Sequence, residues 1–163
     1  MIIRRTVGLL LPICLSYLSL ALGVSCSSTG DDAGVTKVKP YHLVEGKRLE
    51  ASDRSIPFEY DHYMHGAVSS EEKRARQGNY YTVMWNLKAS SPAKLRFEYR
   101  QANTGSTVKR KDLPVDGGRR NRGTSEFRVT GDEYKTDGKV TAWKIALIQD
   151  GSTVDSTQSF LWE

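Results

Sequence analysis

Apolar side chains alternate with polar ones over several short stretches of the chain, which is the pattern of half-buried β-strands. In segment 80–88 every second residue is apolar, and segment 94–100 repeats the pattern with charged residues in between. A shorter run at 126–129 alternates in the same way. We therefore predict three strands with one buried face each, whose inward residues in the two longer runs are Tyr81, Val83, Trp85, Leu87, Leu95, Phe97 and Tyr99.

The C-terminal part of the chain predicts a long β-hairpin. Asp150-Gly151 separates segments 139–149 and 152–162, and this dipeptide favours a two-residue turn in which both positions have positive φ. Such a turn pairs Gln149 with Ser152 and Leu147 with Val154. The register places six apolar side chains on one face: Trp143, Ile145, Leu147, Val154, Phe160 and Trp162.

Three weaker segments complete the predicted fold. Segment 36–44 contains Pro40, which is typical of an edge strand, and segments 56–60 and 107–109 are shorter candidates. Seven or eight short strands predict an all-β protein with a single antiparallel β-sandwich. Its architecture resembles immunoglobulin-like and fibronectin type III-like domains, with a central strand that carries Trp85 and a late hairpin that closes the sheet.

One short helix is expected among the strands, near residues 70–77. Ser69 suits the N-cap position, and Glu72 stands three residues later, where a capping box requires it. Gly78 is a suitable C-terminal stop. One or two helical turns should therefore precede the strand at Tyr80.

The N-terminal segment has the composition of an export signal. Arg4 and Arg5 precede a run from Thr6 to Ser25 that contains no charged residue, as in the signal helix of exported proteins. The run of 20 residues is also long enough to span a bilayer. We predict that residues 1–25 are either a cleaved signal peptide or a signal anchor, and that the rest of the chain is exported.

Leu22-Gly23-Val24-Ser25-Cys26, followed by Ser-Ser-Thr-Gly, resembles the lipobox of bacterial lipoproteins, with Gly23 where that family usually has leucine. The resemblance implies that Cys26 becomes the first mature residue and carries a lipid that anchors the protein to a membrane. The chain would face the periplasm or the cell exterior. Residues 26–35, rich in Ser, Thr, Gly and Asp, would form a flexible tether before the domain at 36–163.

Basic residues are concentrated between positions 109 and 122, where Asp112 and Asp116 are the acidic residues. Gly117 and Gly118 within this segment predict a mobile loop. The cluster is either a solvated hairpin tip or a contact site for anionic lipid headgroups or envelope glycopolymers. Because the protein is expected to be exported, a nucleic-acid partner is not expected. The candidate contact residues are Lys109, Arg110, Lys111, Arg119, Arg120 and Arg122.

Aromatic residues outside the predicted core face offer a second binding hypothesis. They could form a stacking platform for sugars, as in carbohydrate-binding modules, or could cover the edges of the sheets. The four residues are Tyr41, Tyr60, Tyr63 and Tyr80.

Catalytic and metal-binding signals are weak. His62 and His65 lie near Glu59 and Asp61, but a zinc site needs three or four ligands, so no metal and no cofactor are predicted. No serine occupies a G-x-S-x-G elbow. We therefore predict a non-enzymatic binding or scaffolding protein of the cell envelope, with an envelope protein as a further possible partner. A carbohydrate-binding domain and an unrecognised hydrolase are the alternatives.

Overall fold

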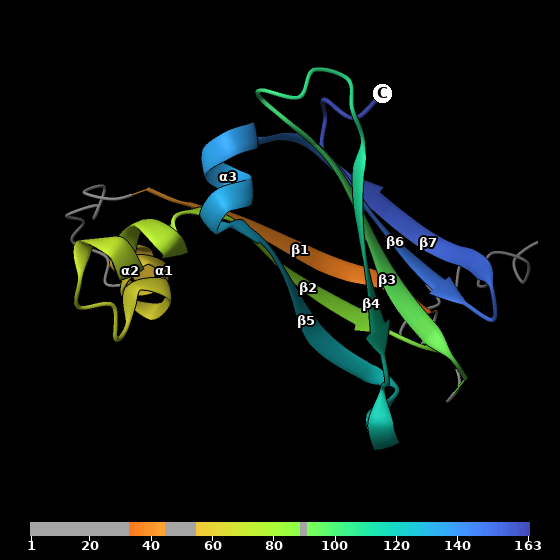
Figure 1. The fold of residues 1–163 in the computed structure, drawn as a ribbon. Helices are drawn as coiled ribbons and strands as arrows, with labels where there is room; N and C mark the ends of the chain where they lie inside the picture. The colour runs from red at the N-terminus through yellow and green to blue at the C-terminus, as the bar shows by residue number, and fades with distance from the viewer. Residues whose placement is uncertain (1–32, 45–54, 89–90) are drawn as a thin grey trace, which may run out of the picture. The chain divides into compact units, whose positions relative to one another are not determined.

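The computed structural model describes residues 33–44, 55–88 and 91–163, and the structural statements below refer to these residues (Figure 1). The predicted export segment and Cys26 lie outside them. Two antiparallel sheets contain the seven described strands. Sheet A has the order β1-β2-β5, with bounds β1 Gly34–Leu43, β2 Gly78–Asn86 and β5 Arg122–Thr130. Sheet B has the order β4-β3-β6-β7, with bounds β3 Ala93–Gln101, β4 Lys109–Val115, β6 Val140–Gln149 and β7 Ser152–Gln158.

The core lies between the two sheets and confirms the predicted all-β sandwich. Val83 from sheet A and Leu95, Phe97, Ile145 and Leu147 from sheet B are fully buried. The central strand of sheet A, β2, carries Trp85 as predicted. The alternating residues were therefore sufficient to identify the inward faces of β2 and β3. These contacts all fall within the compact unit Asp31–Glu163, which thus contains its own core.

The predicted short helix is present as α2, Ser70–Arg76. Its capping box is complete: the Ser69 hydroxyl accepts a hydrogen bond from the Glu72 amide at 3.1 Å, and the Glu72 carboxylate accepts one from the Ser69 amide at 2.9 Å. The Val68 amide also donates to the Glu72 carboxylate. The two bonds from the Ser69 and Val68 amides lower the pKa of Glu72. Local sequence signals fixed this helix at both ends.

The prediction of a strand at 56–60 is wrong, because these residues belong to helix α1, Ser55–Met64. Three alternating apolar residues are too few to distinguish a period of two from a helical period. Tyr60, Tyr63 and Met64 follow helical spacing and form part of one apolar cluster. The helix α3, Gly131–Asp137, and the single turn of 3₁₀ helix η1, Gly118–Arg120, were not predicted. The candidate at 107–109 contributes Lys109, the first residue of β4.

The C-terminal hairpin forms, but its predicted register holds only next to the turn. A β-bulge between Leu147 and Ile148 inserts one residue, so Leu147 pairs with Asp155 and not with Val154. This shift turns Val154 outward, leaving it 44% exposed. In exchange, the Asp155 carboxylate accepts a hydrogen bond from the Val35 amide at 2.8 Å, which connects β7 to β1. β7 ends at Gln158, and Phe160 is 94% exposed beyond it.

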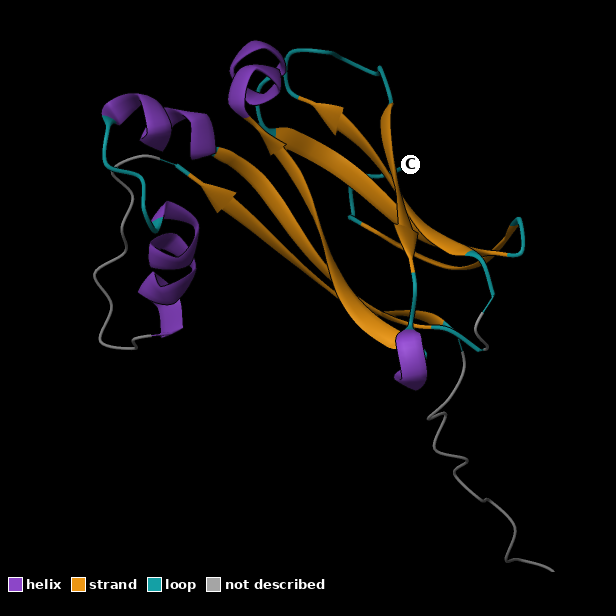
Figure 2. Ribbon diagram, turned by 60° about the horizontal axis from the view of Figure 1, so that its bottom comes forward, coloured by secondary structure: helices purple, strands orange, loops and turns teal. Residues whose placement is uncertain are grey.

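Strand pairing defines two ends of the sandwich. At one end, Gly34 lies opposite Asn86, and Asn86 lies opposite Arg122. We call this the η1 end, because the connection from β4 to β5 contains η1. The three α-helices gather toward the other end, which we call the α3 end (Figure 2). None of the helices in the described part of the chain is long and apolar enough to span a membrane.

Candidate functional site

The six basic residues of segment 109–122 do not form one loop. Lys109 to Val115 is the strand β4, whose seven residues span about 20 Å at the usual rise per residue. Lys109 lies at the α3 end, whereas Arg119 and Arg120 belong to η1 and Arg122 begins β5. The predicted single cluster is therefore divided between opposite ends of the sandwich.

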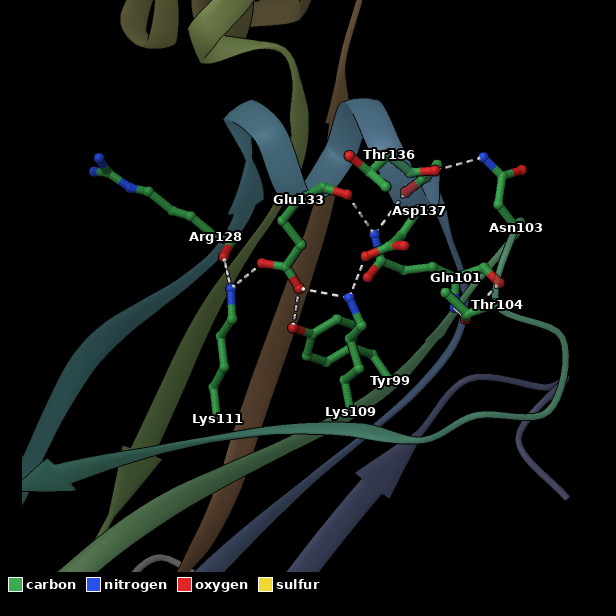
Figure 3. A network of polar contacts seen from close by, with 11 residues as sticks. Tyr99, Gln101, Asn103, Thr104, Lys109, Lys111, Arg128, Glu133, Thr136 and Asp137 are labelled. Atoms are coloured by element: carbon green, nitrogen blue, oxygen red, sulfur yellow. Dashed lines mark hydrogen bonds and ion pairs between the residues drawn. The ribbon is translucent and has the colours of Figure 1, made fainter.

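At the α3 end, Lys111 is bound by Glu133 of helix α3 (Figure 3). The Lys111 ammonium donates to the Glu133 carboxylate at 2.8 Å and to the Arg128 carbonyl oxygen at 2.7 Å. The Tyr99 hydroxyl donates to the same carboxylate. Partial burial acts to raise the pKa of Glu133, but the hydrogen bonds from Lys111 and Tyr99 and the nearby positive charges outweigh it and lower the pKa.

Lys109 is held by the same helix. Its ammonium forms an ion pair with Asp137 and lies 3.6 Å from the Glu133 carboxylate. The buried Gln101 amide donates to the Gly138 carbonyl oxygen at 2.8 Å, so a fourth side chain from β3 and β4 contacts α3 or its C-terminal cap. Two ammonium groups face two carboxylates here. These lysines are part of the attachment of α3 to sheet B and are not open to an external anion.

Arg110 lies between these two lysines in sequence but points to the other side of β4. It pairs across the sheet with Glu98, on the outer face of sheet B, and is exposed. It therefore belongs neither to the network at α3 nor to the η1 end.

The η1 turn is a hydrogen-bonded structure. The Asp116 carboxylate accepts a bond from the Gly118 amide at 2.9 Å, and the Asn121 carbonyl oxygen accepts one from the Leu87 amide at 2.6 Å. Gly118 and Asn121 have φ of 52° and 49°, the left-handed values that close the turn. A Cβ on Gly117 would lie 2.4 Å from the Asn121 Cα, so only glycine fits there.

This turn presents Arg119, Arg120 and Arg122 to solvent. All three side chains are exposed, and the ion pairs found among residues 33–44, 55–88 and 91–163 involve other cations. The nearest carboxylate in sequence, Asp116, is engaged with the turn backbone. The three guanidinium groups thus remain uncompensated within the described residues.

Sheet A adds two lysines that the sequence reasoning missed. Lys37 pairs with Met84 and Lys39 with Thr82, and these partners alternate with the inward Val83. Both lysines are exposed on the outer face of sheet A, the face to which Arg122 also belongs by its pairing with Asn86. The sequence signal was the alternation of lysine with valine over residues 37–39, but only strand pairing shows that these lysines lie beside η1. We call the following five residues the basic surface: Lys37, Lys39, Arg119, Arg120 and Arg122.

The predicted aromatic platform comes together as a small second core. Tyr63 stacks between Tyr41 and Tyr80, with ring centroids 5.4 Å and 3.9 Å apart. Tyr63 and Tyr80 are only 9% and 4% exposed, and Tyr60 packs against the same cluster. Burial raises the pKa of Tyr63 to about 12. These rings attach α1 to sheet A, and the buried pair has no free face for a sugar.

The two candidate metal ligands lie on or beside α1. The His62 ring stacks on the exposed Phe58 at a centroid distance of 5.9 Å, and His65 follows the end of the helix. Across the residues that the structure describes, His, Cys, Asp and Glu form no group of three or more that could hold a metal ion.

The chemistry that the basic surface offers is the binding of anions. Guanidinium and ammonium groups donate charge-assisted hydrogen bonds to phosphate and carboxylate oxygens. The surface is formed by exposed side chains without ion-pair partners in the described part of the chain, so an extended anionic partner fits it better than a small enclosed ligand. Comparison of the chain with protein-family models, with curated proteins and with solved structures finds no match.

Proposed function

We propose that this protein is an exported, membrane-tethered and non-enzymatic domain that binds or scaffolds at the cell envelope through its basic surface. The N-terminal segment and Cys26 support the export and the lipid anchor. The alignment of Gly34, Asn86 and Arg122 across three neighbouring strands supports the contact site. At a spacing of about 4.8 Å between strands, the start of β1 lies about 10 Å from Arg122.

The covalent chain limits how far this end can lie from a lipid on Cys26. Seven residues lie between Cys26 and Gly34, and a fully extended chain covers at most about 29 Å over the eight steps from one Cα atom to the next. An anchor at Cys26 therefore holds the η1 end near the membrane surface. The α3 end, at the other end of the strands, is the part that can extend away from it.

The expected partner is anionic. Each lysine or arginine near a negatively charged leaflet contributes about 1 kcal/mol of attraction, and the basic surface holds five such residues that lack ion-pair partners in the described part of the chain. An envelope glycopolymer or an acidic envelope protein offers related chemistry. Export argues against nucleic acid as the partner.

Intact-mass spectrometry of the full chain extracted from native membranes tests the tether. We expect a mature protein that begins at Cys26 and carries added acyl mass. The Cys26→Ser variant should lose that mass, whereas the matched Cys14→Ser variant should keep it, because Cys14 lies within the removed segment. A full-length unmodified chain would replace the lipid with a signal anchor. A cleaved, unmodified chain would contradict the membrane tether.

A further inference from the structure

We propose that the basic surface binds the anionic phospholipid headgroups of the same membrane that holds the tether. The domain then lies with its η1 end and the adjoining outer face of sheet A against the bilayer. This inference rests on the proposed function and specifies its partner. A glycopolymer would share the anionic chemistry, so the experiment below separates the two.

Two groups of cations from distant parts of the sequence form one surface. Lys37 lies in the row of sheet A that contains Met84 and Thr124, two residues along the strands from the row that contains Arg122. Arg122 lies two strands away from Lys37 and two residues further along the strand direction. Standard sheet spacings place their Cα atoms about 12 Å apart. The contact area therefore extends from the η1 turn onto sheet A, which allows several headgroups to be bound together.

Two carboxylates that lie near this surface in the sheet or in the sequence, those of Glu126 and Asp116, are already engaged. Glu126 lies across β2 from Lys39, but its carboxylate accepts a hydrogen bond from the Tyr63 hydroxyl at 2.9 Å and pairs with Arg128. Asp116 caps the η1 turn. Within the described residues, these two carboxylates thus hold the fold together, and the five cations remain available to an external anion.

The position of Gly34, where the chain enters β1, favours the anchoring membrane over a distant polymer as the partner. The anchor holds the η1 end within about 29 Å of the lipid, which makes binding to neighbouring headgroups an intramolecular event with a high effective concentration. Even weak contacts are then occupied. Two acidic residues, Asp31 and Asp32, precede β1 by three and two positions in the sequence. Their charges oppose the attraction, and we expect binding that weakens strongly with added salt.

Vesicle sedimentation tests the proposal with the compact unit 31–163, which contains its own core and lacks the anchor. The vesicles are phosphatidylcholine with and without phosphatidylglycerol, and polygalacturonate serves as a soluble polyanion. The first variant is Arg119→Ser/Arg120→Ser/Arg122→Ser and the second is Lys37→Ser/Lys39→Ser. The control, Arg74→Ser/Lys135→Ser/Lys139→Ser, removes three charges from helices or loops at the α3 end.

We expect binding only to vesicles with phosphatidylglycerol. Because each basic residue contributes about 5-fold, the arginine variant should bind about 150-fold more weakly and the lysine variant about 30-fold more weakly. The control should change binding less than about 3-fold. An equal loss in the control would overturn the proposal, because net charge alone would then explain the binding. Binding to polygalacturonate without binding to vesicles would also overturn it and identify a glycopolymer as the partner.

A second measurement uses the full chain in lipid nanodiscs. Amide hydrogen exchange at residues 118–122 should be slower in phosphatidylglycerol than in phosphatidylcholine, while exchange in α2 should be the same in both. Equal exchange at the turn would overturn the proposal even where the shortened chain does not fold. If Cys26 is acylated but the protein does not bind the vesicles, the proposed function stands and only the lipid contact is refuted.

Discussion

Lys109 and Lys111 differ from Arg119, Arg120 and Arg122 in what surrounds them, although all five lie within one segment of 14 residues. The two lysines face the carboxylates of α3 and are part of its attachment to sheet B. The three arginines lie on a hydrogen-bonded turn at the other end and face solvent. A local count of charges in the sequence therefore overstates the charge that a partner can meet.

The comparison indicates separate roles for the two groups. Paired charges that are partly removed from water stabilise the fold, because loss of one partner leaves the other without its hydrogen bonds. Exposed, unpaired charges contribute little to folding and are available for binding. Substitutions in the two groups should thus affect different measurements.

The largest effect is expected for Glu133→Gln, which keeps the shape of the side chain but removes its charge. Loss of the ion pairs with Lys111 and Lys109 should reduce the free energy of unfolding by about 2 kcal/mol at pH 7. The triple arginine variant should change it by less than about 0.5 kcal/mol. Urea unfolding followed by tryptophan fluorescence measures both. Equal losses would contradict the assignment of separate roles.

Lower pH should remove the difference between the wild type and Glu133→Gln. The folded protein lowers the pKa of Glu133 below its ordinary value of 4.5, so the carboxylate stabilises the fold above that value. This stabilisation is lost as the pH falls through the lowered pKa of the folded state. The two unfolding free energies should therefore converge at a pH below 4.5. A difference that stays constant from pH 7 to pH 3 would show that charge is not its cause.

Gly117→Ala should disturb the η1 turn without changing any charge. The added methyl group would meet the Asn121 Cα at 2.4 Å, which should cost about 1 kcal/mol of stability. Displacement of the arginines should also weaken vesicle binding. Gly105→Ala is the control, since a Cβ there has open space and only its φ of 58° opposes the change. Unchanged vesicle binding in Gly117→Ala would mean that the positions of the arginines are unimportant.

The smallest effect is expected from the acidic residues before β1. Asp31→Asn/Asp32→Asn should strengthen binding to phosphatidylglycerol vesicles about 3-fold to 10-fold, because two charges that oppose the basic surface are removed. The matched variant Glu71→Gln/Asp132→Asn removes the same number of charges at the α3 end. It should alter binding less than about 2-fold, because salt screens charges that lie far from the contact. Similar gains in both variants would indicate that the whole net charge determines binding.

Local patterns predicted much of the fold. Alternation identified the inward faces of β2 and β3, and the capping residues Ser69 and Glu72 located α2. The pattern failed at 56–60, where three apolar residues fit a strand and a helix equally well. It also failed along the hairpin, because the bulge at Leu147 depends on the bond between Asp155 and β1, far away in sequence.

The candidate site was predicted only in part. Its arginines were visible as a basic segment, but Lys37 and Lys39 were missed, and Lys109 and Lys111 were assigned to it although α3 binds them. No sequence signal near positions 109–111 indicates that Glu133 and Asp137 lie beside them. The four tyrosines belong to one apolar cluster, but its position between α1 and sheet A could not be predicted once part of that helix was taken for a strand.

The sequence by itself determined the inward faces of β2 and β3, the place of the capped helix and which residues carry charge, because these properties depend on neighbours within a few positions of the chain. Tertiary structure alone decided which charges are neutralised and which remain available, because ion pairing depends on distances of a few ångströms between residues far apart in sequence. Strand pairing also decided that Gly34 lies beside the arginine turn. The proposed membrane contact depends on that tertiary arrangement.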